Sequence, residues 1–406
     1  MPAVVERKCA RQAGLAFWAA GLLVLFLTGC STESKPAQVS WTTNNIPVSL
    51  SNAVLSVRMK FAPDTHLSIF KVDILRNGRH FALKGDVENP AAKIEAVAAA
   101  RRSGFKVADE IDVLPDPKLG DKLWGVTTLS VVNVREKAGN PMEMGTQMLT
   151  GEAFKVWKKQ TNWYLVQTPD DYVGWVEGGG FYNCTRAEAD AWLASPLLIV
   201  TDYEERILEK PEIDAPVVSD VVMGCRVKRI GDSGDWFEVG LADGRTGFLP
   251  KKAAANYAEW QKSRQPTPEN IERTARQFLG RPYSWGCNSI RGLDCSGLTK
   301  FVFFLNGIDL KRNASEQCLQ GAEVPLGDNY SHLKKGDLLF FGHRAHNGKP
   351  EHVDHTAIYL GDKLFIQSSE MVRISSLDTA SPLSDEKRIR SLLHARRILP
   401  DESASR

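Results

Sequence analysis

The sequence has no excess of charge of either sign. It holds 51 Lys and Arg residues against 49 Asp and Glu residues, so the formal net charge is only +2. This balance gives no reason to expect binding to nucleic acid or to an anionic membrane surface. The composition, 43% hydrophobic and 25% charged, is that of an ordinary soluble globular protein. Function must therefore be sought in local motifs.

The chain also lacks an apolar run long enough to span a membrane comfortably. Residues 13–27 are apolar and uncharged, but they are few for a transmembrane helix, and basic residues precede them. This is the pattern of a targeting segment. It ends in Leu27-Thr-Gly-Cys30, which resembles the bacterial lipoprotein signal and implies a diacylated Cys30. Ser31 is not acidic, which favours the outer membrane, and residues 31–45 read as a polar tether. A simple secretory peptide or a short anchor is the alternative.

Cysteine is too scarce and too scattered for a disulfide scaffold. The seven cysteines include Cys9 and Cys30 in the targeting segment. The other five are Cys184, Cys225, Cys287, Cys295 and Cys318. Their spacing, in a chain long enough to build its own cores, argues against structural dependence on disulfides. Whether the cysteines other than Cys295 pair, are buried or are free stays open.

A length of 406 residues predicts two to four domains. Within residues 46–118, runs at 68–75 and 80–86 predict a hairpin around Asn77-Gly78. An alanine-rich helix is expected over 91–103 and a further strand over 108–114. This region is similar to the small α/β BON-type domains of envelope proteins, and the similarity assigns no catalytic residue to it.

The middle of the chain contains a repeat. Asn162-Trp-Tyr-Leu-Val-Gln167 is followed by Asp171-Tyr-Val-Gly-Trp-Val176, and the layout recurs as Asp235-Trp-Phe-Glu-Val239 and Asp243-Gly-Arg-Thr-Gly-Phe-Leu249. Short strands separated by turn signals in this order resemble tandem bacterial SH3-like barrels. The barrels are expected over 119–185 and 186–262. Residues 265–269, with two prolines, then mark a linker and a helix start. The last domain is expected over 263–402.

In that last domain, Asp294-Cys-Ser-Gly297 precedes apolar residues at helical spacing over 298–305. Asp294 is expected at or beside the helix N-cap, with Cys295 in the first turn. Unpaired backbone N–H groups and the positive end of the helix dipole there favour a thiolate over a thiol. The pattern therefore predicts that Cys295 is a nucleophile.

The candidate base is His355. It lies in a predicted strand over 351–361, which turns near Gly361-Asp362 into a returning strand over 364–367. A tight turn centred on Gly361 places His355 opposite Gln367, whereas a two-residue Gly361-Asp362 turn places it opposite Ser368. A cysteine, a histidine and a polar side chain that orients the imidazole form a papain-like triad.

Four histidines suggest a competing chemistry. His343, His346, His352 and His355 lie close together in the sequence, and imidazole is a common zinc ligand. They are not spaced four apart on a helix, and the segment contains Gly348 and Pro350. We therefore interpret them as loop or substrate-rim residues, and expect neither a metal nor any other cofactor.

Five motifs in order over residues 265–400 resemble the NlpC-type cell-wall cysteine peptidases. They are Arg281-Pro-Tyr-Ser-Trp-Gly286, Asp294-Cys-Ser-Gly297, Arg312-Asn-Ala-Ser-Glu-Gln317, Lys335-Gly-Asp-Leu-Leu-Phe340 and His355-Thr-Ala-Ile-Tyr-Leu-Gly361. The resemblance implies a papain-like domain with Cys295, His355 and, in a position where the family often has histidine, Gln367. The fold class expected is multidomain α+β: the papain-like domain follows two all-β barrels and a small α/β domain.

The first barrel resembles that of the γ-D-glutamyl-L-diamino-acid endopeptidases, in Asn133-Val-Arg-Glu136, Glu143-x-x-Thr-Gln147 and Asp171-Tyr-Val-Gly-Trp175. The resemblance implies that Glu143 and Tyr172 close one end of the cleft and hold the free amino group of an N-terminal L-Ala. Asn313, where an acid is common, would make a neutral second contact. The other residues expected at the substrate are Tyr283, Trp285, Asp294 and Ser296, with Tyr283 also a second oxyanion donor beside the Cys295 N–H.

The function expected is hydrolysis of the γ-D-Glu–L-diamino-acid bond in muropeptides with a free L-Ala end. One alternative is cleavage of stem peptides in the intact wall, with barrels that bind glycan. Another is a wall-binding lipoprotein whose peptidase domain is inactive. The expected partners are peptidoglycan fragments and, through the lipid anchor, a membrane, but no nucleic acid. A monomer on the periplasmic side of the outer membrane is expected.

Overall fold

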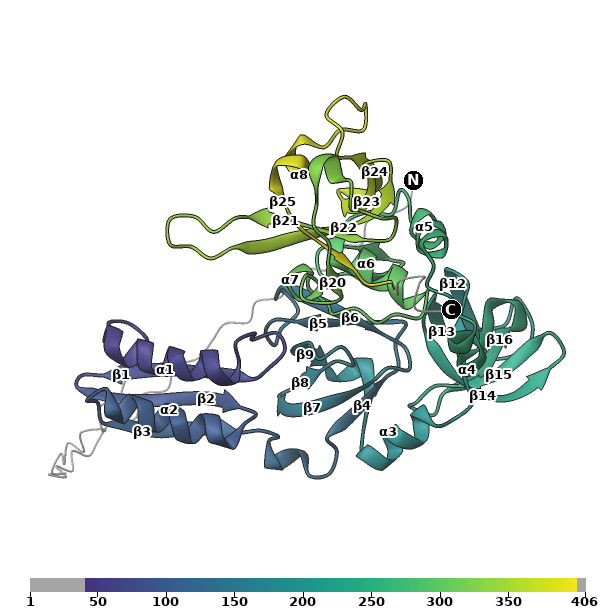
Figure 1. Ribbon diagram of the computed structural model, residues 1–406. Coiled ribbons are helices and arrows are strands. Elements are labelled where there is room, and N and C mark those ends of the chain that lie inside the picture. Colours follow the sequence, from purple (N-terminus) through teal and green to yellow (C-terminus); the bar gives the residue numbers. More distant parts are fainter. Residues whose placement is uncertain (1–40, 400–406) are drawn as a thin grey trace, which may run out of the picture. The chain divides into compact units, whose positions relative to one another are not determined.

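The computed structural model describes residues 41–399, and Figure 1 gives the arrangement of their helices and strands. The targeting segment, the lipidation position Cys30 and most of the tether lie outside the described residues. No helix among the described residues is both long enough and apolar enough to cross a membrane. From Thr42 onward the chain forms one compact unit.

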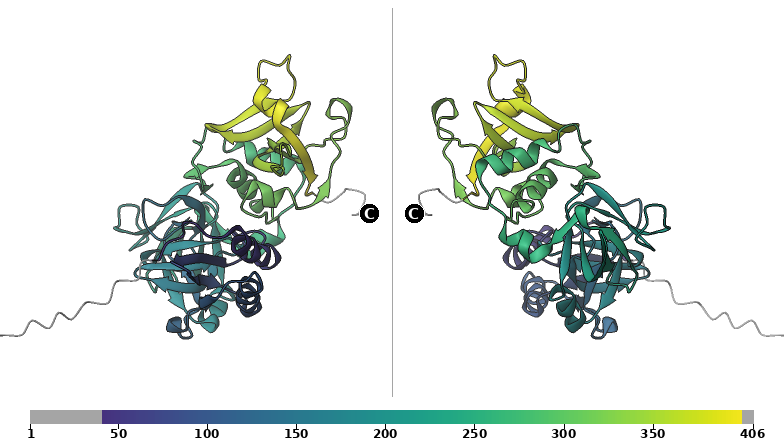
Figure 2. Two further views of the ribbon diagram at one scale, coloured as in Figure 1. Left: turned by 90° about the vertical axis from the view of Figure 1, so that its left-hand side faces the viewer. Right: turned by 90° about the vertical axis from the view of Figure 1, so that its right-hand side faces the viewer.

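The N-terminal domain has the order α1 (Val48–Phe61), β1 (Phe70–Asn77), β2 (His80–Val87), α2 (Pro90–Arg102) and β3 (Val107–Val113). β1 and β2 are antiparallel, with Asn77 opposite His80, and β2 and β3 are parallel. Asn89 caps α2 by accepting from the Ala91 N–H at 2.9 Å, and Pro90 suits the first turn. Both helices cover one face of the sheet (Figure 2). The predicted hairpin, alanine-rich helix and third strand are confirmed.

Two seven-stranded sheets follow, which we call the first and second barrels. The first barrel consists of β4 (Trp124–Thr127), β5 (Val131–Arg135), β6 (Met144–Leu149), β7 (Ala153–Gln160), β8 (Trp163–Gln167), β9 (Val173–Glu177) and β10 (Phe181–Cys184). The second consists of β11 (Leu197–Val200), β12 (Glu204–Leu208), β13 (Val217–Val222), β14 (Arg226–Ser233), β15 (Trp236–Gly240), β16 (Thr246–Pro250) and β17 (Ala254–Asn256). The repeated Trp-aromatic segments form equivalent strands, β8 and β15, each in a hairpin with the strand before it.

Short helices join these parts: α3 (Arg186–Leu193) between the barrels and α4 (Tyr257–Lys262) after the second barrel. Single 3₁₀ turns occur at η1 (Pro117–Leu119), η2 (Gly178–Gly180), η3 (Lys251–Ala253) and η4 (Asp328–Tyr330). Thr185 and Glu188 form a capping box that begins α3.

The C-terminal domain contains α5 (Pro268–Arg276), β18 (Asn288–Ser289), β19 (Gly292–Leu293), α6 (Cys295–Phe304), α7 (Ala314–Gln317), β20 (Ala322–Glu323), β21 (Leu338–His343), β22 (His352–Gly361), β23 (Leu364–Ser369), β24 (Met371–Ser376), α8 (Glu386–Ser391) and β25 (Leu392–Arg397). Its six-stranded sheet has the order β20-β25-β21-β22-β23-β24, with antiparallel neighbours, and α6 packs on β22 and β23. One buried hydrophobic core runs from the second barrel through α6 into this sheet, including Val222, Phe301 and Ile358.

Both registers predicted for the β22–β23 hairpin are wrong. The turn residues are Asp362 and Lys363, both with positive φ (49° and 62°), as a two-residue type I′ turn requires. A bulge between Tyr359 and Gly361 then shifts the register by one residue, so Ile358 pairs with Ile366 and Gln367 is level with Ala357 rather than with His355. Because side chains alternate along a strand, His355 and Gln367 still share one face of the sheet.

Candidate active site

The local sequence around Cys295 builds the start of a helix. Asp294 has extended backbone geometry, and its Oδ1 accepts from the Gly297 N–H at 2.7 Å, which makes it the N-cap of α6. Cys295 follows as the first helical residue and is 6% exposed. The predicted helix start is confirmed.

The predicted low thiol pKa is wrong for this structure. Burial, followed by the negative charge of Asp294, raises the pKa of the Cys295 thiol to about 11. Hydrogen bonds from the backbone N–H groups of Thr356 and Ser296 oppose this rise but are the smaller effect. Desolvation outweighs the helix start because the thiol lies under the surrounding side chains. The resting nucleophile is therefore a neutral thiol, joined to β22 through Thr356.

His355 lies on β22 directly before Thr356 and is 5% exposed. Burial lowers the pKa of its imidazole to about 3, and the positive charge of Arg388 acts in the same direction. A neutral ring has one N–H, and Nε2 lies 2.8 Å from Gln367 Oε1. Because that oxygen can only accept, Nε2 carries the hydrogen and Nδ1 is left as a proton acceptor. This is the tautomer that a general base requires.

The orientation of Gln367 is fixed by groups that the sequence did not suggest. Its Nε2 donates to Ser375 Oγ at 2.8 Å and to Asp385 Oδ2 at 2.9 Å. Its Oε1 also accepts from Arg388 Nε at 3.2 Å. Every partner on the amide nitrogen is an acceptor, which keeps the amide oxygen turned toward His355. Asp385 is the N-cap of α8 and Arg388 lies within this helix. Nothing in the sequence indicated that these residues contact Gln367, about 20 residues earlier.

Asp294 and Ser296 are engaged inside the protein. The Asp294 carboxylate accepts from Arg312 Nη2 at 2.5 Å and from the Gly286 N–H at 2.9 Å, and Arg312 Nη1 donates to Ser296 Oγ at 2.9 Å. Arg312 is 1% exposed, and its Nε donates to Thr146 Oγ1 in the first barrel at 2.9 Å. Their predicted contact with substrate stays a prediction. Arg312 instead joins the residues beside the nucleophile to the first barrel.

The acid that meets Tyr172 is Glu136, not Glu143. The Tyr172 hydroxyl donates to Glu136 Oε1, and the phenol ring is 1% exposed. Glu143 lies before β6 with an exposed side chain, and its carbonyl accepts from the Glu136 N–H. A bulge in the β5–β6 pairing precedes this point, so the motif alone did not reveal which acid faces inward. Gly145 is required here because a Cβ would lie 2.1 Å from the Tyr172 hydroxyl oxygen.

The remaining predicted substrate residues differ in exposure. Trp285 is 60% exposed and Tyr283 is partly buried, as residues at the edge of a cleft would be. Burial and the nearby Cys295 raise the pKa of Tyr283, so its hydroxyl stays protonated and able to donate. Asn313 caps α7 and donates through Nδ2 to Glu316 Oε1 at 2.8 Å, so its amide is already engaged.

The four histidines do not meet as a metal site. His343 and His352 are paired across β21 and β22 at an exposed end of the sheet, whereas His355 is buried. Within residues 41–399, the group whose ligand atoms approach one another closely enough is a different one, Asp64, His66 and Glu316.

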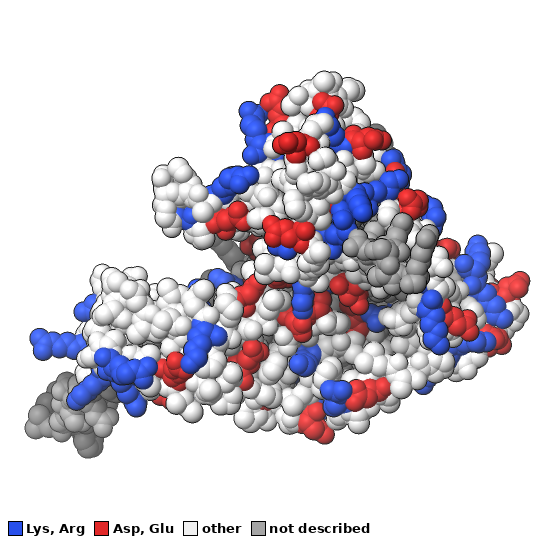
Figure 3. Space-filling model, in the orientation of Figure 1, with Lys and Arg blue, Asp and Glu red and all other residues white. Residues whose placement is uncertain are grey.

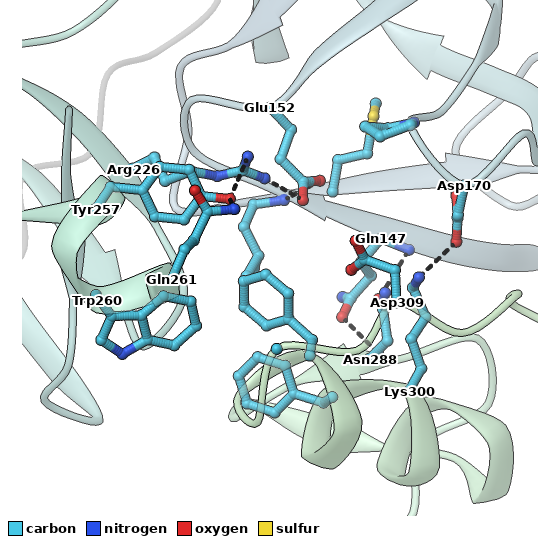
Figure 4. Close-up of a pocket in the computed structure, with 16 residues that line it drawn as sticks. Gln147, Glu152, Asp170, Arg226, Tyr257, Trp260, Gln261, Asn288, Lys300 and Asp309 are labelled. Carbon is cyan, nitrogen blue, oxygen red and sulfur yellow. Dashed lines mark hydrogen bonds and ion pairs between the residues drawn. The ribbon is translucent and has the colours of Figure 1, made fainter. Parts of the chain in front are cut away.

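A cavity of about 240 Å³ lies between the two barrels and α6 (Figure 4). Arg226 lies beside Glu152 there at 2.8 Å, and Lys300 points toward Asp170 at 3.1 Å. Trp260 supplies an aromatic wall. The candidate triad does not line this cavity, and its Arg226 and Lys300 are paired within the protein, so the cavity belongs to the domain junction rather than to the catalytic cleft.

Comparison with known proteins identifies two regions. Residues 280–390 match the NlpC/P60 family, and residues 135–179 match the bacterial dipeptidyl-peptidase SH3 domain. A γ-D-glutamyl-L-lysine dipeptidyl-peptidase of Bacillus cereus is 28% identical over 287 residues, 68% of this chain and 82% of that protein. Dipeptidyl-peptidase 6 of Lysinibacillus sphaericus is 28% identical over 256 residues, 59% of this chain and 87% of that protein.

A solved structure agrees with the fold. The crystal structure of an NlpC/P60 family protein from Bacillus cereus has a TM-score of 0.56 at 24% sequence identity. It covers 68% of this chain and 100% of that chain. Neither matched family region includes residues 42–118.

Proposed function

We propose that this chain, which belongs to the NlpC/P60 cysteine peptidases, hydrolyses the γ-D-Glu–L-diamino-acid bond of peptidoglycan-derived peptides that begin with a free L-Ala. The observation that carries the proposal is the Glu136–Tyr172 pair of the first barrel. Arg312 joins that barrel to the residues flanking Cys295, which supports a position for the pair at one end of the cleft. The names of the relatives support the same bond and the same release of a dipeptide.

The triad performs acyl transfer in two steps. Cys295 attacks the γ-carbonyl carbon of D-Glu while His355 Nδ1 takes the thiol proton. His355 then returns that proton to the amine of the leaving diamino acid, and water hydrolyses the thioester by the reverse proton path. Gln367 keeps the imidazole in the required tautomer. The Cys295 N–H at the helix start and the Tyr283 hydroxyl are suited to stabilise the oxyanion.

The amine end selects for a charged N-terminus. Glu136 keeps 34% of its side chain exposed, so a substrate ammonium can reach its carboxylate. The Tyr172 hydroxyl donates to that carboxylate and holds it in place. An N-acylated peptide cannot supply the ammonium and would leave the half-buried acid without its partner. We also propose that a lipid on Cys30 holds the enzyme as a monomer on the periplasmic side of the outer membrane, where such peptides arise.

The test compares three substrates: free L-Ala-γ-D-Glu-diamino-acid tripeptide, its N-acetylated form and intact peptidoglycan. Glu136→Gln should lower kcat/KM for the free tripeptide by about ten- to a hundredfold, the value of a charge-assisted contact. Glu143→Gln, an exposed acid of the same hairpin, is the matched control and should leave kcat/KM unchanged. N-acetylation should cost the wild type at least as much as Glu136→Gln, and the two losses should not multiply.

Comparable wild-type rates on free and acetylated tripeptide would overturn this specificity. Preferential release of peptides from intact peptidoglycan would then support the stem-peptide alternative. No turnover of any substrate by the wild type would support the inactive wall-binding alternative.

A further inference from the structure

The amine end of the cleft has a wall from a third domain. The loop 62–69, between α1 and β1, crosses from the N-terminal domain to the first barrel (Figure 1). The Val173 N–H donates to the His66 carbonyl at 2.6 Å, and Gln167 Nε2 donates to the Leu67 carbonyl at 3.2 Å. These bonds fix the loop backbone beside Tyr172, the residue that precedes Val173.

The His66 side chain covers the proposed amine site. Its ring stacks on the Tyr172 ring at 5.4 Å between centroids and 29° between planes. Its Nδ1 lies 3.2 Å from Asp64 Oδ1, which also accepts from the His66 N–H at 2.8 Å. Its Nε2 lies 4.0 Å from Glu136 Oε1, a distance that leaves this edge of the carboxylate without a direct hydrogen bond to the ring. His66 therefore stands at the amine-binding acid while Asp64 fixes its ring.

Acids from three domains meet around this imidazole. Asp64 comes from the N-terminal domain, Glu136 from the first barrel and Glu316 from α7 of the catalytic domain. The ligand atoms of Asp64, His66 and Glu316 all lie within 4.8 Å of one another. The hydrogen bond to Asp64 raises the pKa of His66, and the charges of Glu136 and Glu316 add to it. Figure 3 shows acidic side chains gathered on this face, where the catalytic domain meets the first barrel. The surroundings favour a small cation.

We infer that His66 is a specificity-determining residue that closes the amine end of the cleft. The inference rests on the proposed function. An ammonium on the L-Ala nitrogen can reach Glu136, but any group attached to that nitrogen would meet the imidazole or have to displace the loop 62–69. The N-terminal domain is then part of the active site, and its loop limits the substrate to a single residue before D-Glu.

The size of this effect follows from the contact. A group on the L-Ala nitrogen that displaces the imidazole must break its stack on Tyr172, which costs about 3- to 10-fold in an equilibrium, and the clash adds to that cost. Removing the ring should therefore lower the preference for free over blocked peptide by about tenfold. The change should appear in the ratio of kcat/KM for free peptide to kcat/KM for blocked peptide, because His66 stands at the amine end and does not touch the reacting atoms.

The experiment uses the full chain and three peptides: free tripeptide, N-acetyl tripeptide and a tripeptide extended by an N-terminal glycine. His66→Ala should raise kcat/KM for the N-acetyl peptide and for the glycine-extended peptide, and so lower the preference for the free tripeptide about tenfold. His66→Phe keeps a ring on Tyr172 and should retain the preference. His80→Ala, an exposed histidine of the same domain, is the matched control. His66→Gln also removes the ring but can still form a hydrogen bond with Asp64, and it should lower the preference as well. It replaces His66→Ala in the test if that variant fails to fold.

The outcomes separate the inference from the function on which it rests. An unchanged preference in folded His66→Ala or His66→Gln, while the wild type still rejects blocked peptides, would overturn the role of His66 and leave the proposed function intact. A wild type that accepts all three peptides equally would overturn the proposed function itself. If EDTA lowers the preference and Zn²⁺ restores it, the cluster of Asp64, His66 and Glu316 is a metal site, and the inference is wrong.

Discussion

Asp385→Ala tests whether catalysis depends on the orientation of the Gln367 amide. In the wild type, Gln367 Nε2 donates to both Ser375 Oγ and Asp385 Oδ2, while Oε1 faces His355 Nε2 at 2.8 Å. An amide rotated by 180° would point its NH₂ group at the Nε2–H of the imidazole, donor against donor. Asp385→Ala removes one of the two acceptors that oppose this rotation, and Ser375 retains the other.

The magnitude follows from one hydrogen bond. A loss of about 1 kcal/mol in orientation free energy lowers kcat about fivefold. KM for the free tripeptide should stay constant, because the amide lies away from the amine end. Asp385→Asn is the matched variant: it removes the charge, but its amide oxygen can still accept from Gln367, so its kcat should fall less. Gln367→Ala removes the orienting group altogether and should lower kcat more than Asp385→Ala.

A double-mutant cycle decides the point. With Gln367→Ala already present, Asp385→Ala should cost no further kcat. If the two losses multiply, Asp385 acts on catalysis by another route and the reasoning fails. Thermal unfolding is measured in parallel, because Asp385 also accepts from the Arg388 N–H at the start of α8, and loss of a cap costs about 1 kcal/mol of stability.

Three further predictions follow from the same site. Cys295→Ala and His355→Ala should abolish hydrolysis without lowering the unfolding temperature, and turnover by either purified variant would refute the cysteine mechanism. With a thiol pKa of about 11, about 1 in 10⁴ Cys295 side chains is ionised at pH 7, against about 3% for an ordinary thiol. Alkylation of Cys295 should therefore be slow and its rate should rise with pH. Fast, pH-independent alkylation near neutrality would indicate a preformed thiolate–imidazolium ion pair. Arg312→Met leaves Asp294 buried without its partner and should destabilise the fold by about 3–5 kcal/mol, measured by chemical denaturation; an unchanged midpoint would show that the pair is dispensable.

The elements that carry the candidate triad could be predicted from local pattern. Apolar periodicity after Cys295, with Asp294 as its cap, identified α6, and β-branched residues around His355 identified β22. The family motifs supplied Gln367. The register could not be obtained in this way, because it depends on a turn at Asp362 and Lys363 and on a bulge between Tyr359 and Gly361, where a turn that includes Gly361 was expected.

Contacts between distant parts of the chain were not predictable. Glu136 was visible in its motif, but only the β5–β6 bulge determines that it, rather than Glu143, faces Tyr172. His66 lies in a loop about 100 residues before Tyr172, with no spacing that links them. The thiol pKa was misjudged for a similar reason. The helix start is a local feature, whereas burial depends on every element packed over Cys295.

The hydrophobic core shared by the second barrel, α6 and the catalytic sheet makes the cleft a preformed one. Separation of the barrels from the catalytic domain would expose residues such as Val222 and Phe301 to water. It would also break the hydrogen bond between Arg312 and Thr146. Substrate should therefore enter a rigid receptor and lose little affinity to interdomain closure. The barrels and the catalytic domain should also melt together, in one calorimetric transition, and a catalytic domain expressed without them should be insoluble.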